Sequence, residues 1–127
     1  MKKYLTEKYI KEALDDSFIP EENKHGDCFV VALHKFLSNP QRYKLVHGVV
    51  TGQGAIEGIQ YTHAWVEDGD TVIDMTLPKD LQKLPKTLYY ALGHIKLTRE
   101  YDANEVYKMM EKYGTYGYWD SVFDDYY

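Results

Sequence analysis

Three residues that together can transfer an acyl group are spread over the middle of the sequence. Cys28 lies at the expected start of a helix that Asp27 caps, and His63 and Asp74 lie in two neighbouring expected strands. A thiolate is the nucleophilic form of cysteine, and the positive end of a helix favours it. A histidine can take the thiol proton and return it to a leaving amine, while an aspartate fixes the imidazole ring. The pattern predicts covalent catalysis at Cys28, with His63 as base and Asp74 as orienting acid.

A tight turn is expected to bring the histidine and the aspartate together. The Asp-Gly pair at 68–69 is a strong hairpin signal between expected strands at 59–67 and 71–75. Opposite residues of an antiparallel pair share a face of the sheet. A turn centred near positions 68 to 70 places His63 close to opposite Asp74, so we expect their side chains to touch.

Acyl transfer also needs hydrogen-bond donors for the oxyanion that forms on the substrate. The backbone N–H of Cys28 is the first expected donor. The side chain of Asn23 is the second, with Gln53 or Gln60 as substitutes. Trp65 is expected to be a core aromatic or to line the cleft, and the glycine-rich connection at 52–58 is expected to be a mobile loop over it.

The sequence around these residues resembles the papain-like superfamily, in its transglutaminase-like branch. The resemblance rests on three short sequence motifs, Gly26-Asp27-Cys28-Phe29, His63-Ala64-Trp65-Val66 and Val72-Ile73-Asp74-Met75-Thr76. Met75 stands where that branch has a proline, which leaves the aspartate in place. Over roughly residues 23–77, the resemblance implies a cysteine hydrolase or acyltransferase with a Cys-His-Asp triad and no cofactor. Its substrate would be a peptide, an isopeptide or a glutamine side-chain amide.

The surrounding elements predict an α+β chain with a buried helix packed on a small antiparallel sheet, and the resemblance implies that this fold is of the papain-like, transglutaminase-like kind. Its 127 residues suit one domain, 1–127. The helix that begins at Asp27 is apolar around nearly its whole circumference and must stop near Asn39, before a proline. The other expected elements are helices at 4–16 and 103–112, the second closed by Gly114, a loop at 18–26 and strands at 43–51, 59–67, 71–75 and 93–98. Residues 78–88 are expected to be irregular, with room for a short helical turn.

Composition argues against several classes of protein. The net charge of −5 and the pI of about 5.5 oppose nucleic-acid binding, which depends on Lys and Arg facing phosphates. One cysteine allows no internal disulfide. The start of the chain does not resemble a signal peptide, and no stretch approaches membrane-spanning length, so we expect a cytoplasmic protein that does not bind membranes. The expected partner is a peptide or protein amide substrate, and the oligomeric state stays open.

Other interpretations remain open beside the enzyme. The same fold with a degenerate site would be a protein-binding module, and an acidic chain could instead inhibit a partner by occupying its basic surface. The acidic, aromatic residues 118–127 would suit either role, or they form a frayed end. A zinc site made of Cys28, His63 and Asp74 is stereochemically possible, but zinc usually has four well-spaced ligands. We expect His34 to be a structural residue, and His47 and His94 to be strand residues that have ordinary partners or line a cleft.

Overall fold

The structure is a computed structural model that describes residues 27–52 and 56–126. The expected helix 4–16, the loop 18–26, Asn23 and Gln53 lie outside the described residues. In chain order, the elements are α2 (Asp27–Leu37), β1 (Lys44–Thr51), β2 (Gln60–Asp68), β3 (Thr71–Ile73), the 3-10 helix η4 (Lys79–Leu81), β4 (Lys83–Pro85), α3 (Lys86–Gly93), β5 (Lys96–Tyr101), α4 (Ala103–Tyr113) and the 3-10 helix η5 (Ser121–Phe123).

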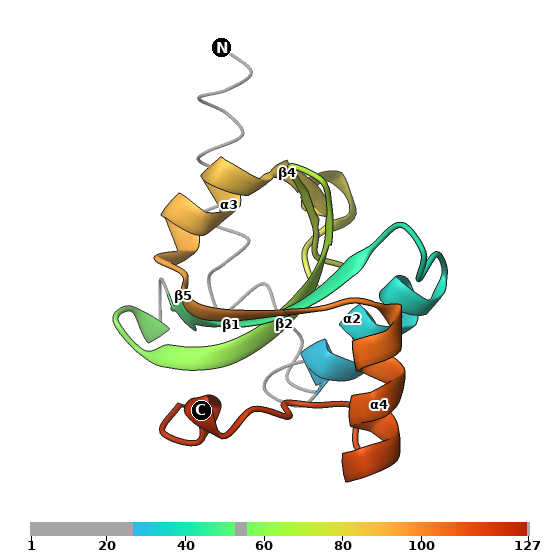
Figure 1. Cartoon of the computed structure of the whole chain (residues 1–127). Coiled ribbons are helices and arrows are strands. Elements are labelled where there is room, and N and C mark those ends of the chain that lie inside the picture. The colour runs from blue at the N-terminus through green and yellow to red at the C-terminus, as the bar shows by residue number, and fades with distance from the viewer. Residues whose placement is uncertain (1–26, 53–55, 127) are drawn as a thin grey trace.

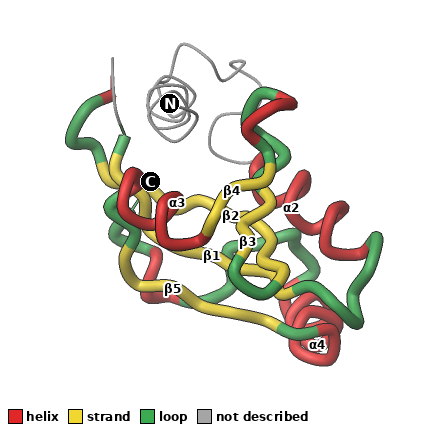
Figure 2. The backbone as a smooth tube through the Cα atoms, turned by 90° about the horizontal axis from the view of Figure 1, so that it is seen from above, coloured by secondary structure: helices red, strands yellow, loops and turns green. Residues whose placement is uncertain are grey.

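The strands form one antiparallel sheet of five, in the order β4-β3-β2-β1-β5. The long strands β1 and β2 make its centre and pair along their whole length, from Lys44 opposite Glu67 to Thr51 opposite Gln60. The sheet is curved, with α3 above it and both α2 and α4 below it (Figure 1). Seen from above, α4 continues directly from the end of β5 (Figure 2). The prediction of an α+β fold with a helix packed on a small antiparallel sheet is confirmed.

Two hydrophobic clusters cover the two faces of this sheet. Successive residues of a strand point to opposite faces. Ala64 and Val66 of β2 therefore pack in the cluster that includes Leu33 and Phe36 of α2, both fully buried. Trp65, which lies between them in sequence, belongs to the other cluster, on the side of α3. This alternation sends His63 and Trp65 to the same side of β2, toward the elements that follow β3.

Helix α2 has a wider exposed side than expected. His34 and Leu37 are exposed and Lys35 is half-buried, whereas Leu33 and Phe36 have no solvent-accessible surface. One face of the helix lies on the sheet and in the cluster that α4 completes, while the opposite face meets solvent. The prediction that His34 is a structural residue of a buried helix is therefore wrong.

Local signals set the bounds of α4 well. The Asp102 carboxylate accepts a hydrogen bond of 2.9 Å from the Glu105 backbone N–H, and the Glu105 side chain accepts one of 3.2 Å from the Asp102 N–H. This reciprocal cap satisfies donors that a helix start leaves unpaired. The helix ends at Gly114, whose φ of 67° lies in the left-handed region that glycine adopts without strain. The expected helix 103–112 is confirmed, with its closing glycine.

The segment after β3 differs most from expectation. The expected irregular stretch 78–88 contains η4, β4 and the start of α3. The expected strand 93–98 lies later, at Lys96–Tyr101, because α3 runs to Gly93 and the chain turns at His94, which has a φ of 46°. His94 is exposed at this turn and is not a strand residue.

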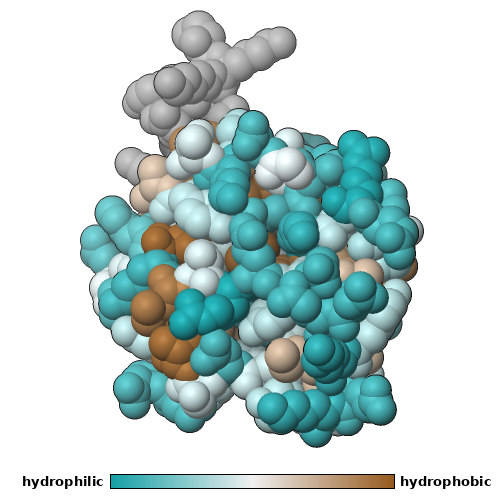
Figure 3. Space-filling model, in the orientation of Figure 1, coloured by the Kyte–Doolittle hydropathy of each residue, from teal (hydrophilic) through white to brown (hydrophobic). Residues whose placement is uncertain are grey.

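The end of the chain packs against the core. Trp119 is 6% exposed and Phe123 is fully buried, so residues 118–123 are not a frayed end. In the face shown in Figure 3, polar residues cover most of the surface and an apolar group gathers at the lower left. Within the described ranges, no helix combines the length and the apolar character that crossing a membrane requires.

Candidate functional site

The three residues of the expected triad come from three different elements. Cys28 lies in the first turn of α2, His63 in the middle of β2, and Asp74 directly after the end of β3. All three are buried, with exposed fractions of 2%, 7% and 1%. The structure thus places a thiol, an imidazole and a carboxylate in the interior, where charges interact strongly and unpaired charges are unfavourable.

The imidazole of His63 connects the other two side chains. Its Nε2 lies 2.8 Å from Asp74 Oδ2. A second side-chain hydrogen bond joins His63 to Cys28. Because Nε2 is occupied by Asp74, the remaining ring nitrogen, Nδ1, is the one available to the thiol. The order thiol, imidazole, carboxylate is the one that a nucleophile, its base and the group that orients the base require.

The histidine and the aspartate meet by a different register from the expected one. The hairpin pairs Asp68 with Thr71 and Val66 with Ile73, so its turn is centred between Gly69 and Asp70. Position 74 therefore lies across from position 65, and His63 reaches Asp74 diagonally. Diagonal neighbours on one face of a sheet lie within reach of long side chains. The expected contact forms, but the prediction that the two residues lie nearly opposite each other is wrong.

The Asp74 carboxylate is held by four hydrogen bonds. Its Oδ1 accepts bonds of 3.0 Å from the Thr76 backbone N–H and 2.6 Å from the Thr76 hydroxyl. Its Oδ2 accepts a bond of 2.6 Å from the Tyr89 hydroxyl, besides its contact with His63. Burial raises the pKa of Asp74, but the charge of His63 and these hydrogen bonds outweigh burial and lower that pKa below its ordinary value. The carboxylate is therefore ionised and cannot rotate freely.

The imidazole of His63 is protonated in this environment. Burial is the largest influence and lowers its pKa, but the charges of Asp74 and Cys28, with the hydrogen bonds to both, raise the pKa well above the ordinary value. A positively charged imidazole therefore lies between the side chain of Cys28 and the carboxylate of Asp74.

Two residues of the site lie outside the expected set. Tyr89 of α3 is 1% exposed, and burial followed by the charge of Asp74 raises the pKa of its hydroxyl well above the ordinary value. The hydroxyl therefore stays protonated and donates to Asp74. Tyr89 was missed because no element was predicted between the irregular segment 78–88 and the expected strand 93–98. The contact with Thr76 could have been predicted from the sequence, since an Asp side chain commonly accepts hydrogen bonds from the residue two positions later.

Tyr89→Phe is expected to lower the free energy of unfolding by about 2 kcal/mol, because it removes one hydrogen bond from a buried carboxylate. Urea denaturation followed by tryptophan fluorescence measures this change. Tyr107→Phe on α4 is the matched control, since Tyr107 is 48% exposed, and it should change stability by less than about 0.5 kcal/mol. Equal unfolding midpoints for Tyr89→Phe and the unmodified protein would show that the hydroxyl does not support Asp74.

Trp65 is a core residue, not part of a cleft wall. It has no exposed surface, and its Nε1 donates a hydrogen bond of 2.9 Å to Glu67 Oε2. Its ring lies against Gly48 of β1, where an added Cβ would come within 2.6 Å of Trp65 Cη2. Gly48 pairs with His63 across the strands, so this close packing also fixes the backbone beside the imidazole.

The remaining predicted donor, Gln60, does not join the triad. It lies exposed at the start of β2, three positions before His63. An odd separation along a strand sends two side chains to opposite faces. Gln60 therefore points away from the face that carries the imidazole.

The metal alternative is not supported. Over residues 27–52 and 56–126, no three His, Cys, Asp or Glu side chains are grouped so that they could hold a metal ion. His63 Nε2 and Asp74 Oδ2 are in direct hydrogen-bond contact, which leaves no room for an ion between them.

Comparisons with protein-family models, with curated proteins and with solved structures found no match. Function is therefore inferred from the residues and their geometry.

Proposed function

We propose that this chain is a cysteine hydrolase or acyltransferase of papain-like, transglutaminase-like architecture that acts on an amide through a thioester at Cys28. The observation that carries the proposal is the position of His63, which is hydrogen-bonded to both Cys28 and Asp74. An imidazole between a thiol and a fixed carboxylate can act as the base that activates the thiol as a nucleophile. The substrate would be a peptide bond, an isopeptide bond or a glutamine side chain.

In the first half of the reaction, the Cys28 sulfur attacks the carbonyl carbon of the amide. A tetrahedral intermediate forms, and its negative oxygen needs hydrogen-bond donors. The backbone N–H of Cys28 lies in the first turn of α2, where helix N–H groups have no partner within the helix. His63 then gives its proton to the amine nitrogen, the C–N bond breaks, and a thioester remains on Cys28.

In the second half, water or an acceptor amine attacks the thioester carbonyl. His63, now neutral, takes a proton from the attacking group, and the C–S bond breaks. A carboxylic acid or a new amide leaves, and the thiolate–imidazolium pair is restored. Asp74 keeps its charge throughout, because its role is to hold the ring of His63 and to stabilise the imidazolium.

An activated ester is expected to acetylate Cys28. In p-nitrophenyl acetate, the sulfur should displace nitrophenolate and give a burst of yellow product, with the mass of one acetyl group added to the protein. We expect Cys28→Ala to lower the burst rate by about 100-fold or more. Hydroxylamine cleaves thioesters but leaves acetyl-lysine intact, so it separates acylation of Cys28 from side reactions. An unchanged, hydroxylamine-resistant acetylation in Cys28→Ala would contradict the proposal.

A binding module with an inactive site is the second candidate function. The observation that favours it is the burial of Cys28, whose exposed fraction of 2% limits access for a substrate carbonyl. A papain-like fold can keep its architecture without chemistry, since function depends on the site. Folded protein whose thiol reacts with neither the ester nor a small alkylating reagent would support this second candidate.

A further inference from the structure

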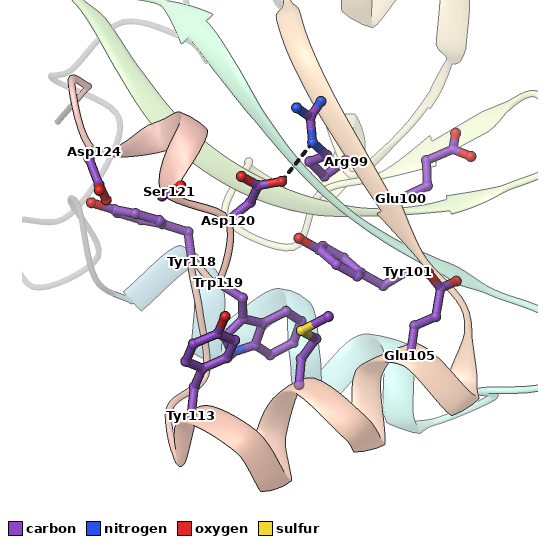
Figure 4. A pocket seen from close by; sticks show the side chains of 11 residues that line it. Arg99, Glu100, Tyr101, Glu105, Tyr113, Tyr118, Trp119, Asp120, Ser121 and Asp124 are labelled. Carbon is purple, nitrogen blue, oxygen red and sulfur yellow. Dashed lines mark hydrogen bonds and ion pairs between the residues drawn. The ribbon is translucent and has the colours of Figure 1, made fainter.

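A pocket of about 590 Å3 lies between β5, α4 and the segment that leads into η5 (Figure 4). Its described lining residues do not include Cys28, His63 or Asp74, so it is separate from the triad. The volume is within the range of small-ligand sites, about 300–1,000 Å3. Its chemistry can therefore be considered independently of the proposed enzymatic function.

Carboxylates dominate the charge of this pocket. Glu100, Glu105, Asp120 and Asp124 line it, against the single cation Arg99. Arg99 Nε lies 2.8 Å from Asp120 Oδ2, so these two charges compensate each other. Glu105 accepts a backbone hydrogen bond in the α4 cap, and Asp124 accepts one from the Tyr118 hydroxyl. Among the residues that the structure describes, no cation is paired with Glu105 or Asp124, and the pocket keeps a negative charge.

Aromatic rings supply the other part of the lining. Tyr101, Tyr113, Tyr118 and Trp119 all line the pocket, and in Figure 4 the ring of Tyr118 lies beside Asp124. Tyr101 and Trp119 pack edge to face, with centroids 5.1 Å apart. The chain's own Lys112 Nζ lies 5.1 Å from the centroid of the Tyr113 ring, so this ring already attracts a cation. Aromatic faces next to carboxylates suit a positive group on an aliphatic stem.

We propose that this pocket binds lysine or arginine side chains from a basic segment of a protein partner. An aliphatic stem lies on the exposed ring of Tyr113, and the cationic heads of neighbouring basic residues meet Glu105 and Asp124, which lie apart in Figure 4. Charge complementarity selects this class of ligand, since the pocket repels phosphates and acidic peptides. The pocket shares none of its lining residues with the triad, so it is a recognition site in its own right.

Titration of the full chain with acetyl-Arg-Arg-amide, followed by 1H–15N NMR, tests the proposal. The indole Nε1–H signal of Trp119 should shift and saturate, while acetyl-Glu-Glu-amide should leave it in place. Glu105→Gln with Asp124→Asn is expected to raise the dissociation constant about fivefold. These changes keep the hydrogen-bonding shape of both residues. Tyr113→Leu should raise it about threefold, through the lost ring face.

A charge-matched control separates the pocket from the overall negative charge. Glu111→Gln with Asp125→Asn removes two exposed carboxylates outside the pocket, and it should change the dissociation constant less than about twofold. Equal weakening by the two double variants would overturn the proposal, because binding would then follow net charge. A Trp119 signal that ignores the basic peptide would overturn it as well. Either failure leaves the ester acylation of Cys28 as a separate test of the enzyme.

Discussion

His63→Ala is expected to slow the alkylation of Cys28 by iodoacetamide about 100-fold near pH 6, because the proposed reaction needs a protonated imidazole beside the sulfur. The protein has one cysteine, so alkylation is read without ambiguity from intact mass. The thiolate is the reactive form, and His63 stabilises it as long as the imidazole is protonated. Because the pKa of His63 is raised well above its ordinary value, the imidazole is protonated at pH 6.

The His63→Ala variant separates the effect of the imidazole on the alkylation rate from the effect of the burial of the thiol. Without His63, the sulfur loses its cationic partner, and an ordinary free thiol with a pKa of about 8.5 is less than about 1% ionised at pH 6. Burial slows the reagent in both proteins, so the ratio of their rates reports the ion pair. His34→Ala is the matched control, since His34 is an exposed histidine of the same helix as Cys28 and should have no effect.

Two outcomes would contradict a thiolate–imidazolium pair. One is a wild-type rate that rises tenfold for each pH unit up to pH 8, as for an ordinary thiol. The other is the same rate profile in His63→Ala and in the unmodified protein. Circular dichroism of His63→Ala checks that it is folded, and His63→Gln offers a variant closer in volume and polarity.

Sequence signals predicted the elements that depend on neighbouring residues. The Asp-Gly turn predicted the hairpin between β2 and β3, and Gly114 predicted the end of α4. These signals are local, because a turn type or a helix end is decided by four or five adjacent residues. The turn lies within the predicted range, but its register places position 74 across from position 65, so His63 and Asp74 are diagonal neighbours.

The parts of the fold that depend on contacts between distant residues could not be predicted from local sequence signals. Strand β4 has only three residues, too few for an alternating pattern. It forms because it pairs with the edge strand β3. Leu84 is then buried in the hydrophobic cluster that contains Trp65. Tyr89 becomes part of the site only because α3 crosses that side of the sheet. The triad was predicted from residue types and their order, whereas the groups that hold its carboxylate needed the fold.

The surroundings of His47, on the buried strand β1, could not be predicted from local sequence either. His47 was expected to have an ordinary partner, but neither ring nitrogen has a hydrogen-bond partner within the described residues. Its ring is packed against Phe29 of α2, Tyr101 of β5 and Trp119 near the chain end, at centroid distances of 5.1, 5.2 and 5.0 Å. Trp119 lies more than seventy positions away in sequence, so no local pattern indicates that it closes a purely aromatic environment around His47.

Acid is therefore expected to destabilise this protein through His47. Burial lowers the pKa of His47 to about 3, against 6.5 for an ordinary histidine. Between these two values, the unfolded chain binds a proton that the folded chain does not, so stability falls as the pH falls. Each pH unit in this window removes up to about 1.4 kcal/mol, and about 4–5 kcal/mol is lost over the whole window. Such a loss is comparable with the whole stability of a small domain.

The triad acts outside this window. The raised pKa of His63 adds stability that is complete below the unfolded value of 6.5 and is lost as the pH rises through the folded value. The lowered pKa of Asp74 adds stability that is present above 3.8 and is lost as the pH falls through the folded value. Between about pH 6.5 and pH 4, His47 is thus the buried histidine whose protonation opposes folding.

Urea denaturation at several pH values measures the effect. The unmodified protein is expected to lose about 2–3 kcal/mol of unfolding free energy between pH 6.5 and pH 4.5. His47→Leu, which places an apolar side chain of similar size among the aromatic rings, should remove most of that dependence. His34→Leu is the matched control and should retain it, because His34 is exposed. The same acid slope in His47→Leu as in the unmodified protein would show that another group takes up the proton. A slope lost only in His47→Leu would show that the buried imidazole limits stability in acid.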